Sequence, residues 1–235
     1  MNYFFCPTPE INTRQFVLEP EESRHIVKVL RKQVGDTLHI TNGKGLLFCT
    51  EILEANPKKC TVQVNDCVKN ERAAFNLYLA VAPTKRVERF QWLLEKATEI
   101  GVTRIIPLIC ERSERENLPL DRLNRVIQEA MKQSLQTWLP ELSPPINFNT
   151  FLQDNLPHQR FIAHCEPHEK SLLLELANKG QDSVILIGPE GDFTPGEIQA
   201  ARAQNFAPIS LGATRLRTET AALVACTTLN LLNQS

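Results

Sequence analysis

The hydrophobic pattern of the chain changes near residue 72, and this change constrains the fold more than any other feature. From about residue 75 onward, apolar runs of strand length alternate with amphipathic stretches of helix length. Strands are predicted at residues 76–82, 104–108, 160–164, 183–187 and 208–211, and helices at residues 87–100, 121–135, 195–204 and 218–232. This alternation predicts an α/β domain with a mainly parallel sheet over residues 72–235.

Residues 1–71 follow a different pattern. Short runs of alternating apolar and polar residues at 37–41, 46–53 and 60–64 are separated by turn residues such as Asn42-Gly43. Runs that alternate with a period of two residues and are separated by such turns predict a small antiparallel sheet or β-barrel.

One helix, predicted over residues 21–32, interrupts these strands. Arg24, Lys28, Arg31 and Lys32 fall on one side of it, and Ile26, Val29 and Leu30 on the other. The basic side is either a solvated surface or a contact for a polyanion, and periodicity alone leaves both interpretations open.

Overall charge and cysteine content narrow the class of protein. The net charge of −1 excludes a chain that is basic throughout, so binding to a nucleic acid would have to rest on local clusters of charge. The seven cysteines form no CxxC pair and are odd in number, which favours free thiols in a reducing compartment. With no run of about 20 apolar residues, we expect a cytoplasmic protein.

Two loops carry the residues most suited to chemistry. One runs from Gly188 to Phe193 after the strand at 183–187, and the other from Leu211 to Thr220 after the strand at 208–211. Ligands of open α/β sheets bind at such carboxyl ends of strands. Gly188 and Gly191 would allow a close backbone approach to a ligand, and Thr218 could cap the last helix.

Glycines in these loops could instead serve only as tight connections. Glu190 and Arg217 argue against that alternative, because packing does not require a charged residue at either position. No GxGxxG or GxxxxGK[ST] motif is present, which disfavours a Rossmann dehydrogenase or a P-loop NTPase.

On these two loops the chain resembles the ribosomal RNA small subunit methyltransferase E family of the SPOUT superfamily. Further matching segments are Arg24-His25, 29–31, Gly35-Asp36, 95–101, 111–114 and 129–134. Two departures stand out. The family has glycine where this chain has Asp192, and it often has Gly-Arg where this chain has Leu135-Gln136.

The resemblance implies a SPOUT-type α/β knot (a deep trefoil knot) methyltransferase domain at 72–235, preceded by a PUA-like β-barrel RNA-binding domain at 1–71. It also implies a homodimer, with Ala221, Ala222 and Ala225 as a close-packing helix face, and no metal. S-adenosyl-L-methionine is the implied cofactor, and N3 of a uridine in 16S rRNA of the small ribosomal subunit is the implied methyl acceptor.

The implied site residues form three groups. Arg217 would either stabilise charge on the uracil or brace its loop by hydrogen bonds to backbone carbonyls, and Glu190 would either accept a proton or fix its loop. The cofactor would be held by Leu186, Gly188, Pro189, Glu190, Gly191, Leu211, Gly212, Leu216, Arg217 and Thr218. Contacts to RNA are expected from Arg24, Lys28, Arg31, Lys32, Lys85, Arg86, Arg89, Arg112 and Arg115.

Two other functions fit the same scaffold: methylation of a tRNA base or ribose, and a non-catalytic role as an RNA-binding assembly factor. A metal site at His164, Cys165 and His168 is not expected, because Pro167 breaks helical spacing and no second pair of ligands occurs.

Overall fold

The computed structural model describes residues 2–167 and 170–234. Two compact units emerge, one of Met1–Arg72 with Gln128–Leu139 and the other of Ala73–Ile127 with Pro140–Ser235. The sequence pattern did not indicate that residues 128–139 belong with the N-terminal unit. The domain boundary between residues 71 and 72 stays a prediction.

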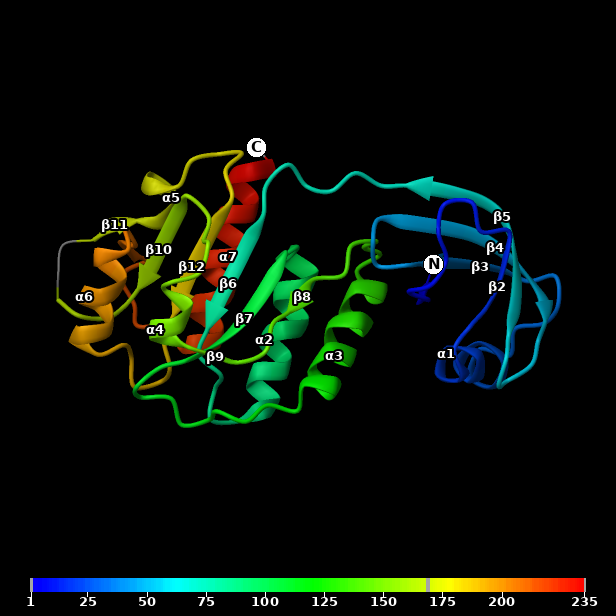
Figure 1. The fold of residues 1–235 in the computed structure, drawn as a ribbon, viewed down its shortest axis with the longest axis horizontal. Coiled ribbons are helices and arrows are strands. Elements are labelled where there is room, and N and C mark those ends of the chain that lie inside the picture. Colours follow the sequence, from blue (N-terminus) through cyan, green and yellow to red (C-terminus); the bar gives the residue numbers. More distant parts are fainter. Residues whose placement is uncertain (1, 168–169, 235) are drawn as a thin grey trace. The chain divides into compact units, whose positions relative to one another are not determined.

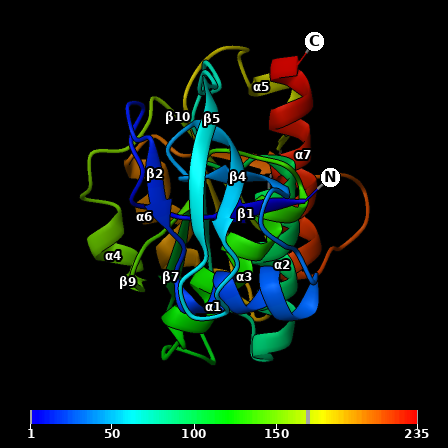
Figure 2. The same cartoon turned by 90° about the vertical axis from the view of Figure 1, so that its right-hand side faces the viewer.

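The N-terminal unit is built on a five-stranded sheet in the order β1-β3-β4-β5-β2. Its strands are β1 (Tyr3–Phe5), β2 (Gln15–Val17), β3 (Thr37–Thr41), β4 (Leu46–Glu54) and β5 (Thr61–Lys69). β1 pairs with β3 in parallel, and the other pairs are antiparallel. Alternate residues, among them Phe48, Ile52 and Val62, form the core of this unit. Figure 2 shows β4 and β5 side by side, with α1 (Pro20–Arg24) near one end of them.

The helix predicted over residues 21–32 is present, but it ends earlier and is not a regular α-helix. The α-helical turn α1 passes directly into a π-helical turn, η1 (His25–Val29), and the helix stops at Leu30. Ile26 is fully buried as expected, but Val29 and Leu30 are 66% and 36% exposed. A π-turn takes about one residue more than an α-turn, so it rotates the following side chains away from the face that periodicity assigns to them.

The second unit has an eight-stranded sheet in the order β11-β13-β10-β12-β6-β7-β8, with β9 paired to β7 off this path. Its strands are β6 (Leu77–Val81), β7 (Arg104–Ile109), β8 (Glu141–Leu142), β9 (Ile146–Asn147), β10 (Gln159–Ala163), β11 (Ser171–Leu172), β12 (Ser183–Ile187) and β13 (Ala207–Ser210). All pairs are parallel, which confirms the expected α/β architecture. Every residue of β12 is buried, as in a strand covered on both faces.

Helices cover both faces of this sheet (Figure 1). α2 (Val87–Ile100) and α7 (Thr218–Gln234) pack against each other, and α7 also contacts β6 and β12. α4 (Phe148–Phe151) and α6 (Pro195–Ala203) cover the opposite face, where Val184 and Leu186 join their core. α3 (Leu120–Gln133) follows β7, and the short α5 (Leu173–Leu176) contacts α7. Among the described residues, no helix has the length and apolar character needed to cross a membrane.

The expected subunit face on α7 needs correction. Ala222 and Ala225 are completely buried within their own chain, because α7 packs them against neighbouring elements of the same unit. They are therefore not available as a surface for a second copy.

Candidate functional site

Three loops emerge side by side at the carboxyl edge of the parallel sheet. β10 lies between β12 and β13, with both of which it pairs in parallel. The residues that follow these strands, 164–166, 188–193 and 211–217, therefore leave the same edge of the sheet. The sequence analysis had selected the second and third of these loops but not the first.

Two hydrogen bonds tie the three loops together. The hydroxyl of Thr218 donates to the carbonyl of Gly188 at 3.0 Å, and the amide of Cys165 donates to Oδ2 of Asp192 at 2.7 Å. The Thr218 side chain thus links α7 to the loop after β12, whereas the sequence suggested that it would cap α7. The loops form one connected platform rather than three independent connections.

Asp192 explains the first departure from the family pattern. Its backbone has φ +63°, a left-handed conformation that glycine adopts freely and that aspartate tolerates better than most residues. The carboxylate then adds contacts that glycine could not make, because Oδ1 accepts from the amide of Phe193 at 2.9 Å while Oδ2 accepts from Cys165.

The loop glycines meet different requirements. A Cβ at Gly188 would lie 3.1 Å from the ring of Phe193, and a Cβ at Gly191 would lie 3.3 Å from the side chain of Arg112. Both glycines therefore make room for neighbouring protein atoms, a reason that the sequence analysis had not considered. Gly212 is different, because it has φ +126° and open space around its missing side chain.

In the described part of the chain, the loop after β13 leaves a run of backbone amides unpaired. Within the described residues, the amide of Gly212 donates to Oγ of Ser210, and no amide of residues 213–217 donates a hydrogen bond. The guanidinium of Arg217 is exposed and, within the same part of the chain, forms no hydrogen bond or ion pair. Backbone amides and a guanidinium that have no partner among the described residues are available to bind a ligand.

Glu190 is held by the loop after β6. Its Oε1 accepts a hydrogen bond from the amide of Lys85 at 3.0 Å. The carbonyl of Lys85 in turn accepts two bonds from the guanidinium of Arg115, at 3.1 and 2.9 Å. This arrangement favours the second of the two roles considered for Glu190, which is to fix its loop.

The basic residues expected around this edge are partly engaged within the protein. Arg112 donates to the carbonyl of Gly191 at 2.8 Å, and Lys85 forms an ion pair with Glu114 at 2.7 Å. The hydrogen bond and the charge of Glu114 raise the pKa of Lys85. Lys85, Arg112 and Arg115 thus meet at the loops after β6, β7 and β12. Arg86 is exposed at the start of α2.

The sequence analysis missed Glu219. This carboxylate is only 8% exposed, and its Oε2 forms no hydrogen bond within the described residues. Its Oε1 lies 3.9 Å from the guanidinium of Arg89, which is partly exposed on the first turn of α2. A buried carboxylate beside one cation holds that cation in place, so Glu219 orients Arg89 at the edge of the site. In the sequence, the run Arg-Thr-Glu-Thr at 217–220 was the feature from which Glu219 could have been predicted as a site residue.

Residues 164–166 were also missed, because they were considered only as metal ligands. Cys165 is exposed, yet partial burial and the charge of Asp192 raise the pKa of its thiol, and Arg215 opposes them. His168 lies outside the described residues. Among the residues that the structure describes, no group of three histidine, cysteine, aspartate or glutamate side chains could hold a metal ion.

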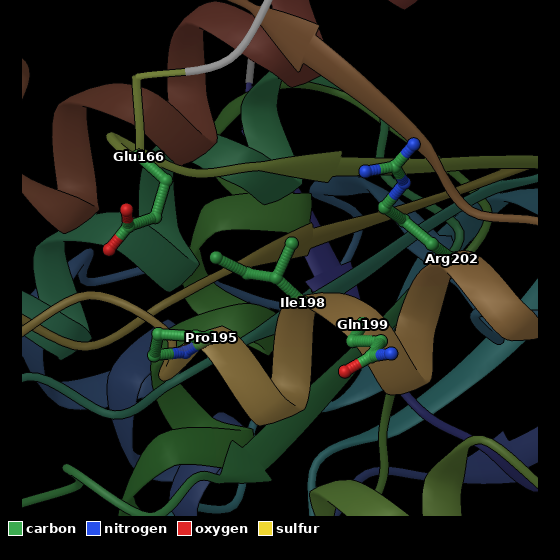
Figure 3. A pocket seen from close by; sticks show the side chains of 5 residues that line it. All are labelled: Glu166, Pro195, Ile198, Gln199 and Arg202. Carbon is green, nitrogen blue, oxygen red and sulfur yellow. The ribbon is translucent and has the colours of Figure 1, made fainter.

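A cavity of about 400 Å³ lies beside α6 (Figure 3). Pro195, Ile198, Gln199 and Arg202 line it from α6, and Glu166 lines it from the loop after β10. Its lining includes no residue of the loops at 188–193 and 211–217, and Glu166 is the residue that it shares with the three loops of the candidate site.

Fold and site together define a class, the RNA methyltransferases that carry an N-terminal PUA domain. The model of an RNA methyltransferase domain matches residues 71–230, and that of an RNA methyltransferase PUA domain matches residues 18–65. The chain belongs to the ribosomal RNA small subunit methyltransferase E family. A relative of that name from Rickettsia conorii is 32% identical over 211 residues, which are 88% of this chain and 86% of the relative.

Solved structures agree with this assignment. A probable rRNA-methyltransferase from Porphyromonas gingivalis is 39% identical, with a TM-score of 0.92 over 100% of this chain and 99% of its own. A ribosomal RNA small subunit methyltransferase E from Neisseria gonorrhoeae, bound to S-adenosyl methionine, is 26% identical, with a TM-score of 0.89 over 99% and 98% of the two chains.

Proposed function

We propose that this protein methylates N3 of a uridine in 16S rRNA of the small ribosomal subunit, with S-adenosyl-L-methionine as methyl donor. The observation that carries the proposal is the convergence of three strand-end loops around a segment, residues 213–217, whose amides are unpaired within the described residues and which ends in an exposed arginine. The names of the relatives support rRNA as the substrate class, and the bound ligand of the Neisseria relative supports the cofactor.

The residues present fit this cofactor. The open space at Gly212 and the free amides after it suit a nucleoside held mainly by main-chain groups. We assign its binding to Leu186, Gly188, Pro189, Glu190, Gly191, Leu211, Gly212, Leu216, Arg217 and Thr218. When bound, the sulfonium of the cofactor supplies an electrophilic methyl group.

Arg217 is assigned to the chemical step. Neutral uracil has no free in-plane lone pair on N3, so its proton must leave before or during attack, and negative charge develops on O2 and O4. A guanidinium without partners among the described residues can stabilise that charge as it forms. Glu190, with Oε1 bonded to Lys85, is assigned to positioning the loop after β12.

RNA contacts are proposed in both units. Arg24, Lys28, Arg31 and Lys32 would contact phosphates from the N-terminal unit, and Lys85, Arg86, Arg89, Arg112 and Arg115 would do so at the edge of the parallel sheet. Arg112 and Arg115 have a second task, because their hydrogen bonds also brace the loops after β12 and β6.

The finer features of the family are proposed as well. They are a deep trefoil knot in the second unit, a homodimer, and action in the cytoplasm, where rRNA is available. Trp92 on α2 and Leu231 on α7 are large apolar side chains left exposed on the paired helices, and they support a subunit contact there. Light scattering at low micromolar concentration should give twice the chain mass of 26.6 kDa, and a 26.6 kDa species would contradict the dimer.

Nucleoside analysis of rRNA from cells that lack the protein tests the reaction. N3-methyluridine should disappear from 16S rRNA and return with the wild-type gene, but not with one encoding Arg217→Ala. An unchanged content of N3-methyluridine in the deletion strain would contradict the proposal.

A second measurement tests cofactor binding without catalysis. Cys165 is exposed next to the site, so S-adenosyl-L-methionine should slow its alkylation. Cys49 and Cys67, both partly exposed in the N-terminal unit, serve as internal controls whose alkylation should not change. Equal rates for Cys165 with and without the cofactor would contradict the placement of the site.

A further inference from the structure

The helical segment of the N-terminal unit is fixed to its sheet along one side only. Ser23 is fully buried, and its hydroxyl donates to the carbonyl of Leu18 at 3.0 Å and accepts from the amide of Cys60 at 2.9 Å. Ile26 is also fully buried in the core of this unit. Because these contacts hold the segment rigidly, its other side is a preformed surface.

That other side presents an apolar cluster, which consists of Val29, Leu30 and Val34. Their side chains are 66%, 36% and 64% exposed. An α-helix would have turned Val29 and Leu30 toward Ile26, whereas the π-turn turns them to solvent. The chain gives up the burial of three branched aliphatic side chains here, and such exposed clusters mark sites of interaction.

Backbone strain is found in the same place. Arg31 has φ +55°, a left-handed conformation in which glycine would be unstrained. A bulky residue in this conformation stores strain, and such positions gather at functional sites. Arg31 follows directly on the two exposed apolar residues, and its own side chain is exposed.

The charges within residues 24–35 are of one sign, and the nearest acid in the sequence after them is Asp36, whose Oδ2 accepts a hydrogen bond from the amide of Gln33 at 2.8 Å. Residues 24–35 contain the four cations Arg24, Lys28, Arg31 and Lys32 and no acidic residue. In the described part of the chain, none of these four side chains forms an ion pair. A surface that combines free cations with aliphatic side chains complements a polyanion that also offers apolar area.

Unpaired RNA has both properties. In a duplex the bases are stacked and paired, so a protein meets mainly phosphates and ribose hydroxyls. In a loop or single strand the flat faces of the bases are open to side chains, beside the same phosphates. A duplex would leave Val29, Leu30 and Val34 without a partner.

We propose that Val29, Leu30 and Val34 contact the bases of unpaired nucleotides in the RNA substrate, while Arg24, Lys28, Arg31 and Lys32 contact the adjacent phosphates. The proposal rests on the function proposed above, and it adds that the N-terminal unit selects unpaired over paired RNA.

Two sets of substitutions separate the two contributions. The apolar set is Val29→Ser, Leu30→Ser and Val34→Ser, and the basic set is Arg24→Gln, Lys28→Gln and Arg31→Gln, each made in the full-length protein. The probes are an unstructured RNA oligonucleotide and a fully paired RNA duplex of the same length. Dissociation constants are measured for both probes over a range of salt concentrations.

The apolar set should weaken binding of the unstructured RNA about tenfold, an order-of-magnitude value based on base stacking, and leave duplex affinity and the salt slope unchanged. The basic set should weaken both probes and flatten the salt slope. A control pair, Ile11→Ser with Val68→Ser, alters exposed apolar residues elsewhere in the same unit and should change neither probe. Val29→Ser alone provides a milder variant in case the triple variant does not fold.

Wild-type affinity of the apolar set for unstructured RNA would overturn the inference, as would an equal loss for both probes. If the apolar set instead changes the mass found by light scattering while RNA binding persists, the cluster is a contact for a second copy of the chain, and the inference is also overturned. Failure of the wild-type protein to bind either RNA would contradict the proposed function itself, a result that these variants cannot produce.

Discussion

Arg217 is the residue at which binding and chemistry can be separated. If its guanidinium acts on charge that develops only in the transition state, Arg217→Ala should lower turnover on the order of 10²–10³-fold. The affinities for RNA and for S-adenosyl-L-methionine should stay within a few-fold. Single-turnover methylation and calorimetric titration measure the two effects.

Arg217→Lys provides the matched comparison. It should restore part of the rate, because a point charge cannot reproduce the planar fork of a guanidinium. Turnover of Arg217→Ala within a few-fold of wild type would make Arg217 a structural residue, and the charge stabiliser would then be sought at Arg89.

Leu135 is a second residue with a measurable consequence. It lies two residues after the end of α3 and has φ +57°. Its side chain is 43% exposed, so burial of that side chain offsets little of the cost of the left-handed conformation. Leu135→Gly should stabilise the protein by about 1 kcal/mol, since glycine carries no such strain. Leu135→Ala keeps the strain and should bring no gain. Urea denaturation measures both, and equal midpoints for the two variants would contradict the explanation.

Both departures from the family pattern were visible in the sequence, but their cause was not. Asp192 and Leu135 replace family glycines, and both lie at positive φ. A sequence motif records that glycine is usual at a position without giving the backbone angle that explains it. The same limit applies to Gly188, whose neighbour is the ring of Phe193 and could be identified only from the packing.

At the scale of elements, the turn between β3 and β4 depends on a segment far away in sequence. The amide of Gly45 donates to the carbonyl of Thr137 at 2.9 Å, and a Cβ at Gly45 would overlap the indole of Trp138. Gly45→Ala should therefore destabilise the protein by about 3 kcal/mol, from backbone strain and overpacking together.

Gly35 offers a control with the same backbone angle. Both glycines have φ +89°, but nothing lies within 4 Å of a Cβ at Gly35. Gly35→Ala should cost only the strain, about 1 kcal/mol. Thermal or urea unfolding would distinguish the two, and similar losses would show that Trp138 does not limit position 45.

The end of α3 carries a buried ion pair in the same unit. Lys132 forms bonds of 2.6 Å to Glu22 and 2.8 Å to Glu129. Burial acts to lower the pKa of Lys132, but its bonds to Glu129 and Glu22 outweigh burial, so the pKa is raised. Lys132→Met should destabilise the protein by about 3 kcal/mol, because Glu22 loses its partner.

The raised pKa fixes the pH dependence of this loss. The pair contributes fully below the unfolded pKa of lysine, about 10.4, and its contribution disappears as pH rises through the higher folded pKa. The difference in unfolding free energy between wild type and Lys132→Met should thus be constant from neutral pH to about pH 10 and shrink above it. A difference that shrinks already below pH 9 would exclude Lys132 as its source.

Elements with strong periodicity were predicted well, and short or irregular ones were not. β12 and α2 match their predicted ranges at 183–187 and 87–100, and Gly101 ends α2 in a left-handed conformation, which glycine adopts without strain. The π-turn at His25–Val29 was missed, because one extra residue per turn leaves no sign in a short apolar pattern. Two-residue strands such as β8 and β11 are set by their neighbours in the sheet rather than by their own sequence.

At the scale of the whole molecule, the N-terminal unit consists of two segments that are distant in sequence, and this leads to a prediction about fragments. Residues 1–72 alone lack the segment 128–139, which supplies Thr137 to Gly45, Lys132 to Glu22 and Leu139 to Gly43. The fragment 1–72 alone should therefore not show cooperative unfolding. The same fragment joined to residues 128–139 by a flexible linker should unfold cooperatively.

Circular dichroism follows this difference in both fragments, and the fluorescence of Trp138 also reports the unfolding of the linked fragment. The linked fragment carrying Trp138→Ala serves as a control, and it should be weaker because the indole packs on Gly45 and donates to the carbonyl of Asn70. Cooperative unfolding of the fragment 1–72 by itself would show that the segment 128–139 is dispensable for folding of the N-terminal unit.

The segment 128–139 also affects which hybrids of two related proteins can fold after their genes recombine. A single crossover near residue 72 between two relatives would join one N-terminal sheet to the other parent's residues 128–139. Gly45 would then face a foreign residue at position 138, and Glu22 a foreign residue at position 132. Hybrids that inherit both segments from the same parent should survive more often than those that do not, so an N-terminal unit of this kind is exchanged as two pieces of the gene rather than one.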